Sequence, residues 1–170
     1  LEEAILFYKK SLNEGIVSRN HKIVLRSMNK LADLYTEINE LDKASIMLNA
    51  IDKYLKNHYY KKGELDYILG RVVYLIETQN HQESLKYVEK GIKCCKDNYK
   101  KHKGSFLFFK GMIYHELGKT YEEIEKFHMK ALELFKAIGY FEGIARIYNS
   151  LGILYSEYGL DNKKAIEYYS

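Results

Sequence analysis

The sequence contains no proline and no tryptophan among its 170 residues. Proline fixes φ and lacks a backbone N–H, so a chain without it has few obligatory breaks, which favours helices. The only cysteines are the neighbours Cys94 and Cys95. On a helix their side chains point about 100° apart, which suits neither an unstrained disulfide nor shared metal binding. No second cysteine cluster completes a zinc site. We therefore expect two reduced thiols at the end of a helix, in a cytoplasmic setting.

The sequence also lacks a strong charge of one sign and a long apolar run. The net charge of +4, spread along the chain, gives weak support to binding of nucleic acid or of a membrane surface. No apolar run approaches the ~20 residues of a membrane span, and the N-terminus does not resemble a signal peptide. Both ends of the sequence lie inside amphipathic patterns, and the first residue is not Met, so we expect a piece of a longer protein.

A helical pattern recurs about every forty residues, a period typical of repeat architectures. A mostly small or apolar residue begins each copy, a bulkier residue follows four positions later, and a third follows three positions after that. The spacing i, i+4, i+7 predicts that these residues share one helical face. The copies are Ala4, Tyr8 and Ser11; Ala44, Leu48 and Ile51; Ser84, Val88 and Gly91; Ile124, His128 and Ala131; and Ala165 with Tyr169.

A second helical pattern of the same period precedes the first. Its copies are residues 28–35, 67–74, 107–114 and 148–155, and each ends on a tyrosine. A small residue lies three positions before that tyrosine in most copies: Ala32, Gly111 and Gly152. The copy at 67–74, with Gly70 and Arg71 near that place, is the poorest match.

These two patterns together resemble the tetratricopeptide repeat (TPR). "YNSLGILYSEYG" followed by "KKAIEYY" matches the family's helix A and helix B with one extra residue in the turn. The period is similar to that of the extended repeats in kinesin light chains, LGN-type adaptors and peptide-sensing bacterial regulators, although the family's closing proline is missing. The resemblance implies an all-α, right-handed superhelical solenoid of antiparallel helix pairs.

The repeats predict five segments in a single array over residues 1–170. Residues 1–17 are an orphan helix B, residues 18–58 are repeat 1, residues 59–99 are repeat 2, residues 100–139 are repeat 3 and residues 140–170 are a truncated repeat 4. The stretches 57–66, 97–106 and 137–146 are predicted to be longer connections between repeats.

Several single residues are assigned structural roles by these patterns. Gly152 lies inside a predicted helix, where glycine costs about 1 kcal/mol relative to alanine, so we interpret it as a place of close helix packing. Gly118 and Gly159 are predicted to end helices in the left-handed conformation. Asp42 and Asp161 are predicted to cap the helices that follow. His128 falls on the packing face of helix B and is expected in the core or an interface.

No arrangement of residues indicates an enzyme, a cofactor site or a metal site. The segment "HELGK" at 115–119 begins like a zinc-protease motif, but Lys119 stands where the second histidine is required. The carboxylates of the helices fall on polar faces, where solvated surface is the better interpretation. The basic segment 93–104 is interpreted as a solvated helix end whose lysines lie near C-terminal carbonyls.

The resemblance instead implies a binding groove lined by the A helices. Carried over by register, the predicted groove residues are Arg26, Asn29 and Asp33 in repeat 1, Ile68 and Val72 in repeat 2, Phe108, Met112 and His115 in repeat 3, and Arg146, Asn149 and Ile153 in repeat 4. An asparagine amide both donates to and accepts from a peptide backbone, and an arginine holds a carboxylate by two hydrogen bonds. An extended peptide with an apolar centre and an acidic group would suit this set, while exposed Arg and Asn are also common on solvated helices.

The function that these expectations favour is protein or peptide binding within a larger regulatory or scaffold protein. Resemblance to bacterial regulators and a Lys-, Ile- and Tyr-rich composition favour a bacterial origin. The alternative is a structural array that forms homo-oligomers without a peptide ligand. A nucleic-acid or membrane partner is not expected.

Overall fold

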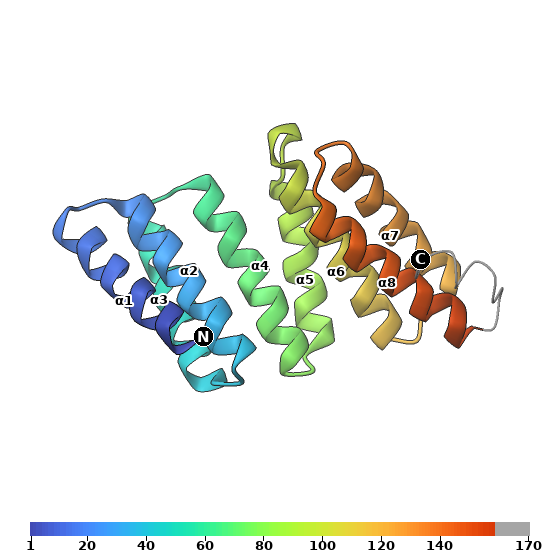
Figure 1. Ribbon diagram of the computed structural model, residues 1–170, viewed down its shortest axis with the longest axis horizontal. Helices are drawn as coiled ribbons and strands as arrows, with labels where there is room; N and C mark the ends of the chain where they lie inside the picture. The colour runs from blue at the N-terminus through green and yellow to red at the C-terminus, as the bar shows by residue number, and fades with distance from the viewer. Residues whose placement is uncertain (159–170) are drawn as a thin grey trace. The chain divides into compact units, whose positions relative to one another are not determined.

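The computed structural model describes residues 1–158. Within this range the chain forms eight α-helices and one short 3-10 helix, and it contains no β-strand. The all-α fold of helix pairs is therefore confirmed, and the helices follow one another as antiparallel neighbours within each of two compact units (Figure 1).

The first unit spans Leu1–Asn80 and holds four helices of nearly equal length. These are α1 (Glu2–Val17), α2 (His21–Glu37), α3 (Leu41–Asn57) and α4 (Lys61–Glu77). Helix α2 packs on both α1 and α3, and α4 packs on α2 and α3. In the core, Leu31, Tyr35 and Ala44 are covered by half-buried apolar residues of α1, among them Ile5 and Leu12.

The second unit begins at His81. It holds α5 (His81–Cys94), the 3-10 helix η1 (Asp97–Tyr99), α6 (Lys100–Glu116), α7 (Tyr121–Lys136) and α8 (Phe141–Glu157). Helix α6 packs on α5, α7 and α8. The boundary between the two units lies at Asn80, inside the segment that the sequence assigns to repeat 2.

The helix-B pattern lies on the buried face of each helix, as the sequence predicts. Ala44, Leu48 and Ile51 of α3 have no exposed surface, and the corresponding residues of α5 and α7 are buried as well. The corresponding residues of α1 are half-buried, which is consistent with α1 packing only on α2. Ala165 and Tyr169 lie outside the described residues.

The short turns are closed by left-handed residues and by the side-chain caps Asn20 and Thr120. Gly118 has φ +63°, which confirms its predicted role. Asp42 was expected to cap α3, but this prediction is wrong, because Glu40 occupies the N-cap position and Asp42 lies inside the first turn. Thr120, which the sequence patterns left out, forms a capping box with Glu123 at the start of α7. Gly159 and Asp161 lie outside the described residues.

The predicted long connections between repeats are also wrong. Helices α4, α6 and α8 begin at Lys61, Lys100 and Phe141, so each connection is only a few residues long. Two glycines in these stretches, Gly104 and Gly143, lie inside helices at places of close packing. A Cβ built on Gly104 or Gly143 would come within 2.5 Å of the Phe135 ring, so glycine lets the helix approach that ring.

Gly111 shows the packing that the sequence predicts for the small residue of helix A. A Cβ at this position would lie 2.6 Å from Cε1 of His128, so the imidazole packs directly on the backbone of α6. His128 is only 2% exposed, which confirms its expected burial. Gly152, at the corresponding position of α8, is also buried. Cys94 and Cys95 lie at the end of α5, as expected, and neither forms a disulfide within the described residues.

Candidate functional site

Residues 1–158 contain neither a candidate metal site nor a helix that could span a membrane. No group of three or more His, Cys, Asp or Glu side chains in this range could hold a metal ion. No helix among these residues is long and apolar enough to cross a membrane. His115, the first residue of the segment that resembles a zinc-protease motif, instead pairs with Glu157 of α8.

The predicted groove residues of α2 divide between surface and core. Arg26 is exposed. Asn29 is buried, and its Nδ2 donates to the Leu25 carbonyl at 3.0 Å and to the Gly63 carbonyl of α4 at 3.3 Å. Its amide therefore ties α2 to α4 in this structure and is not presented to a ligand. The sequence did not reveal this role, because an asparagine on a helix looks the same whether a neighbouring carbonyl or solvent faces it.

Asp33 lies on the surface of α2 near α4. Its side chain is 44% exposed and accepts from Nζ of Lys30 at 3.0 Å. Partial burial raises the pKa of Asp33, and Lys30 opposes that rise. Because like charges repel, this carboxylate is a poor partner for an acidic ligand.

The predicted groove residues of α4 lie in the core. Ile68 and Val72 have no exposed surface, so they offer nothing to a ligand in this structure. Leu69 and Val73, one position later in each case, are half-buried, as are Tyr74 and Ile76 nearer the end of α4. The poorest-matching copy of the repeat therefore gave the wrong helical face, since one residue rotates a helix by about 100°.

The predicted residues of α6 range from buried to half-buried. Phe108 is buried, with its ring centroid 5.6 Å from that of His128. Met112 is half-buried against the core of the second unit. His115 is half-buried, and its Nε2 lies 2.6 Å from Oε2 of Glu157.

The predicted residues of α8 are all on the surface. Arg146 is 60% exposed, and its Nη2 donates to Oε1 of Glu142 at 2.8 Å. Asn149 is exposed, and Ile153 is 40% exposed. Helices α6 and α8 pack on each other, and the pair of His115 with Glu157 joins them. We use "α6–α8 face" for the set Met112, His115, Arg146, Asn149 and Ile153.

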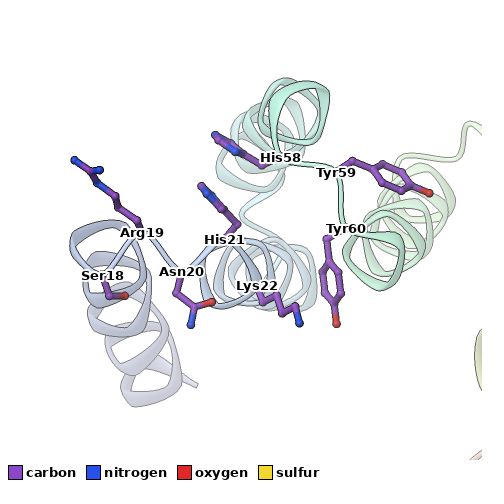
Figure 2. Close-up of a pocket in the computed structure, with 8 residues that line it drawn as sticks. All are labelled: Ser18, Arg19, Asn20, His21, Lys22, His58, Tyr59 and Tyr60. Carbon is purple, nitrogen blue, oxygen red and sulfur yellow. The ribbon is translucent and has the colours of Figure 1, made fainter.

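A hollow in the first unit was not predicted from the sequence. It lies where the connection from α1 to α2 meets the connection from α3 to α4, and its volume is ≈ 530 Å³ (Figure 2). The rings of His21 and His58 stack inside it with centroids 3.9 Å apart. The lining residues are Ser18, Arg19, Asn20, His21, Lys22, His58, Tyr59 and Tyr60. The clue in the sequence was basic Arg19 in the first connection and the aromatic pair Tyr59 and Tyr60 in the second.

Comparison with known proteins gives structural neighbours only. No protein-family model matches the sequence, and no curated protein matches it either. The crystal structure of BtubC (BKLC) from P. vanneervenii is similar, with a TM-score of 0.76 and 17% identity over 98% of this chain and 70% of that chain.

A second neighbour is a Signal Transduction ATPase with Numerous Domains (STAND) protein with a tetratricopeptide repeat sensor, from Pyrococcus horikoshii. The TM-score is 0.72 and the identity 24%, over 99% of this chain and 27% of that chain. The present chain thus spans about a quarter of the STAND protein. The helix pairs, the buried faces of the helices and these two structures agree that the chain has a TPR-like helical repeat fold.

Proposed function

We propose that this chain is a protein- or peptide-binding repeat domain and that the α6–α8 face is its contact surface. The observation that carries this proposal is the exposure of Asn149 and Ile153, one turn apart on α8, together with half-buried Met112 and His115 on the neighbouring helix α6. A surface that offers apolar area beside amide and charged groups suits a peptide with alternating side chains.

The polar side chains of this face can form hydrogen bonds with a ligand. The carboxamide of Asn149 has both a donor and an acceptor for a peptide unit. Among the described residues, Arg146 pairs with Glu142 on the exposed face of α8, and such surface pairs contribute about 0–1 kcal/mol. A ligand carboxylate that binds the guanidinium through two hydrogen bonds would therefore compete well with Glu142.

The test is selection of peptides from a random library, followed by affinity measurements with Asn149→Ala and Arg146→Ala. Loss of a charge-assisted hydrogen bond weakens binding by about tenfold or more, so Arg146→Ala should bind selected peptides at least that much more weakly. Asn149→Ala loses neutral hydrogen bonds and should weaken binding by about two- to tenfold. Lys126→Ala, on the exposed surface of α7, is the matched control. If the peptides bind all three variants as tightly as the parent, the α6–α8 face is not the contact surface.

The proposal extends to the role of the domain within a larger protein. One structural neighbour is described as having a tetratricopeptide repeat sensor, and the likeness supports a sensor or scaffold segment of a cytoplasmic, bacterial regulatory protein. The sequence on either side of this segment in its genome tests this extension. A signalling or DNA-binding domain there would favour the sensor, whereas further repeats would favour a scaffold.

Self-association is the second candidate, and the surface of α1 favours it. Phe7 is 66% exposed, Leu6 is 53% exposed and Val17 is 81% exposed, an unusual amount of apolar surface for one helix. Light scattering at increasing concentration tests this candidate. A mass that rises with concentration in the parent but not in Phe7→Lys would support oligomerisation, and a constant monomer mass would exclude it.

A further inference from the structure

Helix α1 leaves a row of side chains uncovered. Among the described helices it contacts only α2, and its buried Gly15 lies against Ile23 and Val24 of that helix. Another part of its surface is exposed to solvent, and residues three or four positions apart there share one side of the helix. We use "outer stripe" for this exposed set, which consists of Glu3, Leu6, Phe7 and Lys10.

The outer stripe places two apolar side chains between two opposite charges. Leu6 is 53% exposed and Phe7 is 66% exposed. Glu3 precedes them and Lys10 follows them, and the two charges are about 10 Å apart along the helix axis. Neither charged side chain forms an ion pair among residues 1–158, so both are open to an external partner.

The other described helices with the helix-B pattern lack this combination. In α3, α5 and α7 the position of Leu6 is occupied by Ile46, Lys86 and Lys126, all exposed, so the neighbouring helices do not cover it. The central lysines of α5 and α7 would repel the same lysine of a second molecule. Helix α3 has an apolar centre but no acidic residue at either flank. The flanking residues are Lys43 and Ala50 in α3, Glu83 and Lys90 in α5, and Glu123 and Lys130 in α7.

We propose that the outer stripe binds the outer stripe of a second molecule of this chain, with the two α1 helices antiparallel. This inference rests on self-association, the second candidate function, and specifies its contact surface. A twofold axis that passes between Leu6 and Phe7 places Glu3 of each molecule opposite Lys10 of the other. The apolar side chains of both molecules then meet between the two ion pairs, and the contact is self-complementary, as a twofold dimer requires.

Burial of Leu6 and Phe7 favours association, and the charges fix its direction. Apolar area removed from water supplies most of the attraction between two proteins. In a parallel pair Glu3 would face Glu3 and Lys10 would face Lys10, and like charges repel, so the antiparallel pair is preferred. One helix pair buries less than the roughly 1,200 Å² of a stable interface, so the dimer should be weak and should form at high concentration.

Sedimentation equilibrium from about 10 μM to about 1 mM protein tests the proposal by charge reversal. Glu3→Lys and Lys10→Glu each replace both ion pairs by repulsions, so each variant alone should dimerise at least about tenfold more weakly than the parent. An equimolar mixture of these two variants again pairs a glutamate with a lysine at both flanks and should dimerise as tightly as the parent. The double variant Glu3→Lys/Lys10→Glu should recover dimerisation for the same reason.

Lys9→Glu is the matched control, because it makes the same charge change on the neighbouring exposed residue, about 100° around the helix. Its dimerisation should stay within about twofold of the parent. A parent that remains monomeric at about 1 mM would overturn this inference and the self-association candidate together. If the single variants dimerise as well as the parent, the contact lies elsewhere and only this inference is overturned. Loss in the single variants without recovery in the mixture and the double variant would overturn the antiparallel pairing.

Discussion

The buried imidazole of His128 should make the second unit lose stability in mild acid. The ring is 2% exposed and packs against the backbone of Gly111. Its Nδ1 has no hydrogen-bond partner in the described part of the chain. Burial lowers the pKa of His128 to about 4, and the nearby His115 adds to this effect.

The sign follows from comparing the folded and unfolded chains. In the unfolded chain a histidine has a pKa of about 6.5, so above this pH the ring is neutral in both states and its titration changes nothing. As the pH falls from 6.5 toward 4, only the unfolded chain gains the proton, and the free energy of unfolding therefore decreases. The loss amounts to about 2 kcal/mol at pH 5 and approaches roughly 3 kcal/mol below pH 4.

Urea unfolding followed by circular dichroism at several pH values between 7.5 and 5 measures this loss. The comparison variants are His128→Leu and His128→Val, because Leu48 and Val88 occupy the same register position in α3 and α5. Relative to either variant, the parent should lose about 2 kcal/mol between pH 7.5 and pH 5. The two variants have different packing but no titrating ring, so the result depends on pH and not on side-chain volume. A difference between parent and variants that stays constant with pH would refute the reasoning.

Three further substitutions test the packing and capping of the helices. Gly111→Ala places a Cβ 2.6 Å from Cε1 of His128 and should destabilise by about 1–3 kcal/mol in urea unfolding, with a smaller loss when His128→Val is also present. Thr120→Ala removes the capping box of α7 and should cost about 1 kcal/mol, whereas Thr120→Ser should leave the melting temperature nearly unchanged. Gly152→Leu overpacks a buried position of α8 and should cost about 1–3 kcal/mol, so an unchanged melting temperature would show that this position is open.

The sequence predicted the buried faces of the helices well because those faces depend on local spacing. Residues at i, i+4 and i+7 must share one side of a helix, whatever packs against it. Leu48, Val88 and His128 are accordingly all buried. The same logic identified Gly111 as a place of close approach, since a small residue in an otherwise apolar helix is costly unless packing requires it.

The predicted connections between repeats were too long, and glycine could not have shown this, because the same residue serves both turns and close contacts. Gly104 and Gly143 fall in stretches predicted to be connections, yet both lie inside helices beside the ring of Phe135. Only the approach of another helix distinguishes the two cases, and that approach is not encoded in local spacing.

Whether a candidate binding residue is exposed depended even more on tertiary structure. Asn29 and Asn149 look equivalent in the sequence, but a carbonyl of α4 accepts from Asn29, while Asn149 faces outward on α8. The hollow of the first unit brings His21 within stacking distance of His58, which is distant in sequence. The sequence by itself determined which residues form helices and which side of each helix is apolar, because these depend on neighbours within one turn. Tertiary structure decided which polar side chains remain exposed, because that depends on which helix packs beside them.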